Sequence, residues 1–123
     1  MATKIKINND YKIIKRAVSG VLHTDRAIKL IRELSMAAKL QKDYDILIDL
    51  RASVTASEMT DLMAIMSAWS RLANNFNNKI AVILSIDEEH TRFNQTFKTC
   101  MKVQGFEFRQ LSDYDTAIAW LTE

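Results

Sequence analysis

The sequence predicts an α/β fold in a single domain, in which a mixed sheet of about five strands packs against about four helices. Short apolar runs rich in β-branched residues alternate along the 123 residues with longer stretches whose apolar residues recur at helical spacing. The expected element order is ββαβαβαβα, and right-handed crossovers between successive parallel strands place the helices against the sheet. No repeat or shift in composition divides the chain, so we expect one domain over residues 1–123.

The first two strands are predicted to form a hairpin at the edge of the sheet. Residues 4–7 and 11–18 are rich in strand formers, and the turn formers at residues 8–10 separate them. Gly20 marks the expected exit from the second strand.

A helix and a buried strand are predicted next. Thr24 is the expected N-cap of the helix, in which apolar residues recur at helical spacing to about residue 40. Residues 46–50 are apolar except for Asp49, which predicts the first buried strand. Thr55 and Glu58 then fit a capping box, and an apolar helix follows to about Ala73.

The remaining elements complete the alternation. Residues 80–84 are apolar on both faces, as expected for a central parallel strand covered by helices. Asp87 is the expected cap of a helix that continues to Gly105. Residues 106–109 alternate as a half-buried strand, and Ser112 opens the last helix.

The scarcity of certain residues excludes several function classes. Two glycines cannot supply a Walker loop or a dinucleotide-binding turn. One cysteine excludes an internal disulfide, and two histidines without HExxH spacing exclude that metal motif. Cys100 lies on an apolar helical stripe and is expected to be a buried, inert thiol. We therefore expect no cofactor and no metal.

Charge and terminal sequence also limit the partners. The net charge is only +2, and we interpret the basic residues of the first segment as a solvated strand edge, so no nucleic acid is expected. The N-terminus lacks the apolar core of a signal peptide, and residues 80–84, the longest apolar run, are too few to span a bilayer. We expect a cytoplasmic protein without a membrane span.

Polar candidates lie where the parallel strands are expected to end, in segments 51–57 and 85–90, because ligands gather at the carboxyl ends of such strands. Asp49 and His90 could share a cleft as the carboxylate and imidazole of a small hydrolase. Alternatively, Asp49 pairs with Arg51, Asp87 caps a helix and His90 is solvated. The candidate recognition residues are Asp49, Arg51, Ser53, Thr55, Ser57, Glu58, Asp87 and His90.

Hydrophobic candidates lie on the helix that follows Thr55. Its apolar sector covers about half of the circumference, more than a one-sided helix needs. Its methionines could line an adaptable pocket or a partner surface, although the alternative is packing in the core. The candidate hydrophobic surface consists of Met59, Met63, Met66, Trp69, Phe93 and Phe97.

Two segments carry a resemblance to a known family. They are residues 46–51, with the capped helix beyond them, and residues 108–121, where a strand is followed by Asp-Tyr-Asp and Ala-x-Ala-Trp-Leu. With these segments the chain resembles the SpoIIAA-like branch of the STAS domain family, over almost its whole length in element order. The resemblance implies a small non-enzymatic regulatory domain that binds a partner protein, and we expect that it also forms a homodimer.

In the antagonist branch of that family, the resemblance further implies a serine phosphorylated at the N-terminus of the helix after the central strand. Set against the antagonists' Asp-Ser-Ser-Gly, this chain reads Thr55-Ala56-Ser57-Glu58, so Ala56 replaces the usual phosphoacceptor. This departure weakens the expectation of a phosphorylation switch and leaves Ser57 and Thr55 as the candidate phosphoacceptors.

The same branch is similar in fold to the lipid-carrying CRAL-TRIO (Sec14-like) domains, which implies an alternative function. Trp69, Phe93, Phe97 and the methionines would then line a site for a small hydrophobic ligand or a lipid. The function that we expect is that of an interaction module. Binding of a hydrophobic ligand is the alternative, and a hydrolase that uses Asp49 and His90 is the least favoured hypothesis.

Overall fold

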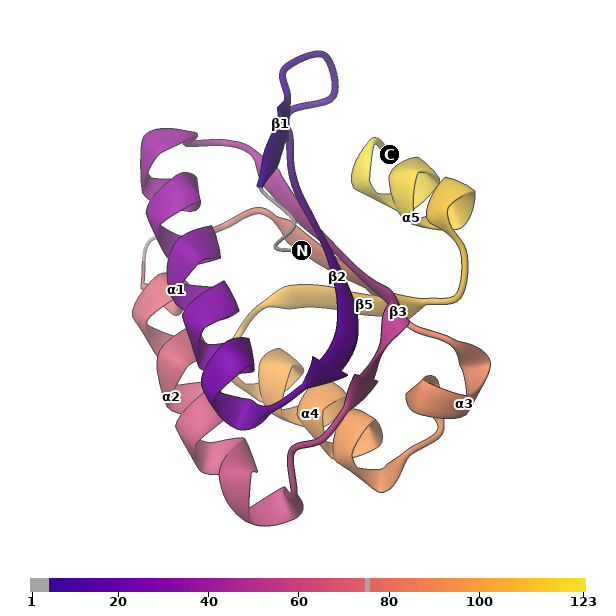
Figure 1. Cartoon of the computed structure of the whole chain (residues 1–123). Helices are drawn as coiled ribbons and strands as arrows, with labels where there is room; N and C mark the ends of the chain where they lie inside the picture. Colours follow the sequence, from indigo (N-terminus) through magenta and orange to yellow (C-terminus); the bar gives the residue numbers. More distant parts are fainter. Residues whose placement is uncertain (1–4, 75) are drawn as a thin grey trace.

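The protein forms an α/β structure built on a five-stranded sheet with the strand order β1-β2-β3-β4-β5 (Figure 1). A computed structural model describes residues 5–74 and 76–123. β1 runs antiparallel to β2, and the other neighbours are parallel. The elements are β1 (Lys6–Asn8), β2 (Ile13–Leu22), α1 (Thr24–Leu40), β3 (Asp45–Thr55), the 3-10 turn η1 (Met59–Asp61), α2 (Leu62–Ala73), β4 (Lys79–Ile83), α3 (Ile86–Glu89), α4 (Arg92–Val103), β5 (Glu107–Leu111) and α5 (Tyr114–Leu121). The predicted α/β class, mixed sheet and edge hairpin are confirmed.

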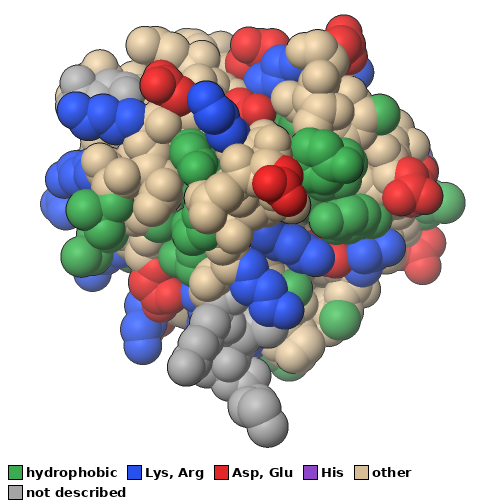
Figure 2. Space-filling view, turned by 90° about the horizontal axis from the view of Figure 1, so that it is seen from above, with side chains coloured by type: hydrophobic (Ala, Val, Ile, Leu, Met, Phe, Trp, Pro, Cys, Tyr) green, Lys and Arg blue, Asp and Glu red, His purple; other side chains and the backbone are tan. Residues whose placement is uncertain are grey.

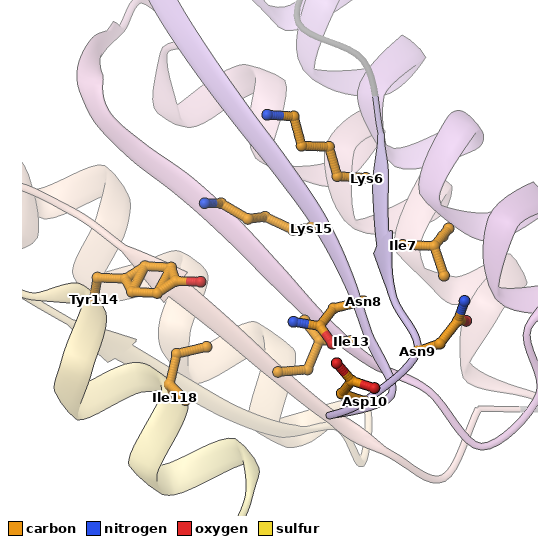
Figure 3. Close-up of a pocket in the computed structure, with 9 residues that line it drawn as sticks. All are labelled: Lys6, Ile7, Asn8, Asn9, Asp10, Ile13, Lys15, Tyr114 and Ile118. Atoms are coloured by element: carbon orange, nitrogen blue, oxygen red, sulfur yellow. The ribbon is translucent and has the colours of Figure 1, made fainter.

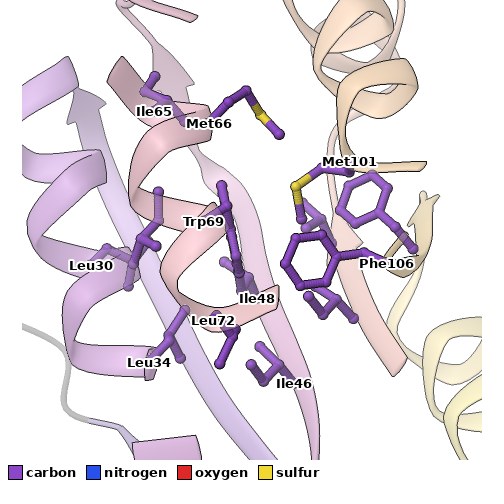
Figure 4. Packing of buried hydrophobic residues seen from close by; sticks show 14 of the residues in the cluster. Leu30, Leu34, Ile46, Ile48, Ile65, Met66, Trp69, Leu72, Met101 and Phe106 are labelled. Carbon is purple, nitrogen blue, oxygen red and sulfur yellow. The ribbon is translucent and has the colours of Figure 1, made fainter. Parts of the chain in front are cut away.

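Helices cover the two faces of the sheet unequally. α1, α2 and α4 lie on one face, and α5 lies on the other (Figure 1). On the first face, strand residues such as Ile48 and Val82 pack against Trp69 and its neighbours, and Trp69 meets Phe106 edge-on at 5.9 Å between ring centroids (Figure 4). Because alternate strand residues point to opposite faces, this arrangement produces two separate apolar cores.

The smaller core lies under α5. Leu47, Ala81 and Ile83 pack there against Trp120 and Leu121. α5 contacts mainly β4 and β5, so it covers only part of this face. The β1–β2 side of the face stays open beside it.

β2 and β3 are longer than the sequence predicts. Gly20 was expected to end β2, but the strand continues through it to Leu22, with Gly20 at φ 84°. A register irregularity between Ala17 and Ser19 lets the pairing with β3 continue to Thr55. Segment 51–57 is therefore mostly strand, because pairing with β2 supplies backbone hydrogen bonds that a local pattern does not reveal.

The capping box predicted at Thr55 is wrong. Thr55 is the last residue of β3, and the chain stays extended through Glu58. The box forms three residues later, where the Asp61 carboxylate accepts the Glu58 N–H at 2.9 Å and η1 leads into α2 at Leu62. The predicted end of this helix at Ala73 is confirmed.

The predicted helix from Asp87 to Gly105 is two helices. Ser85, not Asp87, caps α3, since its hydroxyl accepts the Glu88 N–H at 3.2 Å. α3 ends at Glu89, and Thr91 caps α4 by accepting the Asn94 N–H at 3.2 Å. The structure consequently has one helix more than expected among the residues it describes.

The caps of the first and last helices also differ by one residue from the prediction. α1 begins at Thr24, and His23 occupies the N-cap without a side-chain hydrogen bond. α5 is capped by Asp113 instead of Ser112, because the Asp113 carboxylate accepts the Thr116 N–H at 2.8 Å.

Candidate functional site

The carboxyl ends of β2, β3 and β4 meet η1 and α3 at one edge of the molecule, which we call the carboxyl edge. The Thr55 N–H donates to a Glu88 carboxylate oxygen at 2.7 Å, which ties β3 to α3. The Ser57 and Thr24 hydroxyls lie 2.7 Å apart and join the segment after β3 to the start of α1. The two segments predicted to hold the site are thus brought together.

Asp49 is held by Arg51 in a two-pronged ion pair. Its carboxylate accepts from Arg51 Nη2 at 2.7 Å, from Nε at 3.0 Å and from the backbone N–H at 3.1 Å. These hydrogen bonds from Arg51 lower the pKa of Asp49, although burial opposes them. Asp49 therefore stays ionised at neutral pH, and its carboxylate accepts three hydrogen bonds from Arg51. This is the pairing with Arg51 that the sequence offered as the alternative to a catalytic role.

Asp49 and His90 do not share hydrogen bonds in the described part of the chain. His90 is exposed at the end of α3, with Nδ1 2.8 Å from the Ile86 carbonyl oxygen. Asp87 is exposed in the first turn of α3. Within the described residues each side chain thus hydrogen-bonds a different partner, and a cleft shared by Asp49 and His90 stays a prediction.

Two other polar candidates have structural partners. Ser53 is buried and donates to the Leu50 carbonyl oxygen at 2.9 Å, where β3 departs from regular pairing. Glu58 is exposed and caps η1. Both side chains hydrogen-bond to backbone groups nearby and so stabilise the local structure of the carboxyl edge.

The candidate hydrophobic surface divides into core and exposed residues. Met66 and Trp69 are buried in the main core, whereas Met63 is 83% exposed and Met59 is 37% exposed. Phe93 and Phe97 are half-buried and stack with their ring centroids 6.4 Å apart. Cys100, expected to be buried, is half-buried against the same core.

The carboxyl edge also exposes apolar residues that the sequence reading missed. Val21 and Val54 are register partners at the ends of β2 and β3, and they are 51% and 59% exposed. Ile86 on α3 is 62% exposed. The valines were missed because the segments that hold them were read as loops, and their place on the open face depends on the register shift in β2.

An apolar cavity of about 60 Å³ lies between α1, α2, α4 and the sheet. Several of the predicted residues line it, both apolar (Trp69, Phe93 and Phe97) and polar (Thr55 and Ser57). Figure 4 shows how the side chains of Leu30, Ile48, Ile65 and Trp69, which also line it, converge between the helices and the sheet. Some residues of the candidate hydrophobic surface and some candidate recognition residues therefore line the same cavity.

Gln110 and Asn94 add polar groups to the cavity wall that the sequence reading missed. Gln110 Nε2 donates to the Asn94 carbonyl oxygen at 3.0 Å, but no hydrogen-bond partner reaches the buried Gln110 Oε1 within the described residues. Asn94, itself buried, donates to the Glu88 carbonyl oxygen at 2.8 Å. An unpaired buried acceptor costs about 1–3 kcal/mol, so a donor in the cavity would be stabilised.

Comparison with solved structures finds the same architecture elsewhere. The chain aligns with an uncharacterized protein from the DUF3478 family with a SpoIIAA-like fold, from Shewanella loihica PV-4, with a TM-score of 0.65. The alignment covers 98% of this chain and 92% of that one at 17% identity. The predicted SpoIIAA-like, STAS-type fold is thereby confirmed, and at this identity the likeness shows the fold alone.

Other comparisons and searches give no assignment. A scan against protein-family models finds no match, and neither does a search of curated proteins. In residues 5–74 and 76–123, no helix is long and apolar enough to cross a bilayer. The same residues contain no group of three or more His, Cys, Asp or Glu side chains placed to hold a metal ion.

Proposed function

We propose that the protein is a non-catalytic interaction module that binds a partner protein through the carboxyl edge. The observation that carries this proposal is the exposure of three large apolar side chains there, Val21, Val54 and Ile86, with Met63 exposed on α2 directly after η1; each is more than half exposed. Burial of apolar surface drives association, and methionine is enriched in protein interfaces. The partner would cover these side chains.

The polar groups of the same edge support binding over chemistry. Asp49 is occupied by Arg51, Glu88 by the Thr55 N–H, and the Ser57 hydroxyl lies against Thr24. These contacts fix the backbone that displays the apolar side chains. A rigid surface loses little conformational entropy on binding.

Phosphorylation is not part of this proposal. Ser57 is followed by Glu58 and Asp61, which cap the short η1 turn, and its hydroxyl is already hydrogen-bonded. A phosphate at Ser57 would add negative charge near these two carboxylates, where like charges repel.

A matched pair of variants tests the docking surface. Val54→Glu places a charge on the carboxyl edge, whereas Leu40→Glu places one at the far end of α1, where Leu40 is 82% exposed. Proteins captured by the wild type are identified, and their affinity is measured with purified components. We expect Val54→Glu and Met63→Glu to weaken binding at least about tenfold and Leu40→Glu to leave it unchanged.

Thermal unfolding of each variant shows that the fold is intact. Partners that bind Val54→Glu and Leu40→Glu equally well would contradict the proposal. Sedimentation of the same variants reports whether the partner is a second copy, in which case Val54→Glu dissociates a dimer.

The cavity favours a second candidate function, binding of a small hydrophobic ligand. Its volume of about 60 Å³ is well below the roughly 300–1,000 Å³ of sites for drug-sized ligands, so it favours a small molecule over a lipid. Native mass spectrometry of freshly purified protein tests this candidate. A retained mass that Gln110→Leu abolishes supports it, and a retained acyl chain supports the lipid alternative instead.

A further inference from the structure

A hollow on the second face of the sheet lies outside the carboxyl edge, between the β1–β2 hairpin and α5 (Figure 3). Its volume of about 490 Å³ falls within the range of roughly 300–1,000 Å³ typical of small-molecule sites. The half-buried Ile118 contributes apolar surface, Ile13 lies beneath it with only 2% of its surface exposed, and Lys6, Lys15 and Tyr114 contribute polar groups. The hollow exists because α5 covers only part of this face.

The two lysines occupy an unfavourable arrangement. Lys6 and Lys15 are register partners in the antiparallel β1–β2 pair, so their side chains leave the same face side by side (Figure 3). Like charges directly opposite each other destabilise a strand pair. Neither lysine forms an ion pair with any residue that the structure describes. The hairpin therefore retains a concentration of positive charge that its fold does not require.

Neighbouring groups only partly compensate this charge. Lys15 Nζ lies 4.6 Å from the centroid of the Tyr114 ring, which is a cation–π contact. Asp10 also lines the hollow, and Asp49 on the next strand, whose pKa is lowered mainly by Arg51 and also by Lys15, is ion-paired with Arg51. Figure 2 shows Lys and Arg side chains gathered beside hydrophobic ones on the face seen from above.

Uncharged donors also face the hollow. The Asn8 oxygen accepts the Tyr11 N–H at 3.0 Å, which leaves the amide nitrogen turned toward the hollow in Figure 3. The Tyr114 hydroxyl points into the same space (Figure 3). The Lys15 ammonium, the Asn8 amide and the Tyr114 hydroxyl thus border the space beside Ile118, and the Lys6 ammonium lies at its upper rim in Figure 3.

We propose that this hollow binds a phosphate monoester with a compact apolar or aromatic body. A phosphate monoester carries about −1.5 to −2 charges at pH 7, which matches two ammonium groups better than a singly charged carboxylate does. Lys6 and Lys15 bind the phosphate, Asn8 and Tyr114 donate hydrogen bonds, and Ile118 contacts the body. This site is independent of partner binding at the carboxyl edge.

Calorimetric titration with three probes tests the proposed chemistry. Phenyl phosphate carries both the charge and the body, inorganic phosphate carries the charge alone, and benzyl alcohol carries the body alone. We expect phenyl phosphate to bind most tightly and its affinity to fall as salt is added. Vesicles containing phosphatidate present the same monoester at a membrane surface, and we expect no binding to them, because the hollow receives the body as well as the phosphate.

Lys6→Gln is the central variant, and Lys102→Gln, exposed on α4 on the opposite face, is its charge-matched control. We expect Lys6→Gln to weaken phenyl phosphate at least about tenfold and Lys102→Gln to leave it unchanged. Without ligand, Lys6→Gln should unfold at a temperature no lower than the wild type, because it removes a like-charge contact. With ligand, the wild type and Lys102→Gln should shift upward and Lys6→Gln should not.

Three results would overturn the proposal. They are equal ligand shifts in Lys6→Gln and the wild type, equal affinities for benzyl alcohol and phenyl phosphate, and the lack of saturable phenyl phosphate binding with a Kd below about 1 mM. Binding to the vesicles but not to free phenyl phosphate would also reject it in favour of a membrane headgroup.

Discussion

Asp49 shows how one neighbouring residue can determine the hydrogen bonds and the pKa of a side chain. It accepts three hydrogen bonds from Arg51, and its side chain is only 14% exposed. Its pKa is lowered because the hydrogen bonds from Arg51 favour the ionised form more than burial disfavours it. At this scale the carboxylate stabilises the middle of β3, next to the point where its register with β2 shifts.

Asp49→Asn should therefore lower stability in a pH-dependent way. The folded pKa lies below the ordinary value of 3.8, so the stabilisation is present above that value and is lost as pH falls through the folded pKa. Arg51 is 44% exposed and thus screened by solvent, so we expect a loss of about 1 kcal/mol near pH 7. Urea unfolding at about pH 7 and about pH 3 measures it, and the difference from the wild type should be smaller at the lower pH.

Arg51→Met supplies the second arm of a double-mutant cycle. The coupling energy between the two residues should account for most of the Asp49→Asn loss near pH 7. An equal loss at both pH values would show that the ion pair is not its source.

At the scale of elements, the segment from Thr55 to Asp61 shows how a strand can extend into a predicted helix start. Thr55 pairs with Leu22 in the sheet and donates its N–H to Glu88 instead of Glu58, so the predicted box does not form. The cap moves to Glu58 and Asp61, and α2 begins only at Leu62. The competition is between sheet pairing and local capping, and sheet pairing prevails because it satisfies more backbone groups.

Two substitutions distinguish the observed cap from the predicted one. Asp61→Ala removes the carboxylate that accepts the Glu58 N–H and should cost about 1 kcal/mol. Thr55→Val keeps the shape of the side chain and removes only the hydroxyl, so the free energy of unfolding should change by less than about 0.5 kcal/mol. Chemical denaturation of both variants measures these changes, and the reverse ranking would restore the box at Thr55.

At the scale of the whole molecule, the unequal coverage of the sheet decides where sites can form. Three helices close the main core, whereas α5 alone closes the second face over β4 and β5. Trp120 anchors α5, with Lys79 and Arg109 5.3 and 5.1 Å from its ring centroid. The same partial coverage leaves open the hollow beside the hairpin.

Trp120→Ala should be strongly destabilising, because it leaves a cavity between α5 and β4. Trp120 is 7% exposed, and a buried tryptophan replaced by alanine typically costs about 3–5 kcal/mol. Tyr11→Ala is the control, since this aromatic side chain is 56% exposed and should cost less than about 1 kcal/mol. Guanidinium unfolding measures both variants, and similar losses would indicate that α5 contributes little to the fold.

The sequence by itself determined the alternation of strands and helices, the edge hairpin and the end of α2 at Ala73. These features follow from local periodicity. A strand buried on both faces has a continuous apolar run, as at residues 80–84, and an amphipathic helix has apolar residues at helical spacing along one face. The pairing of Asp49 with Arg51 also followed, because the two residues are close in the chain. The resemblance to SpoIIAA-like domains rested on the same ordered elements.

Only the tertiary structure decided which face of each helix and strand is buried against a neighbour and which is exposed. Met63 and Met66 lie on one helix, yet one is exposed and the other buried, because the neighbouring elements determine which part of the apolar sector is covered. The length of β3 and the opposition of Lys6 and Lys15 depend on register between distant segments, and so does the lack of a partner for Gln110 Oε1 among the described residues. A local pattern assigns a side chain to a face of its own element, but only the packing of elements decides whether that face is buried, paired or left open.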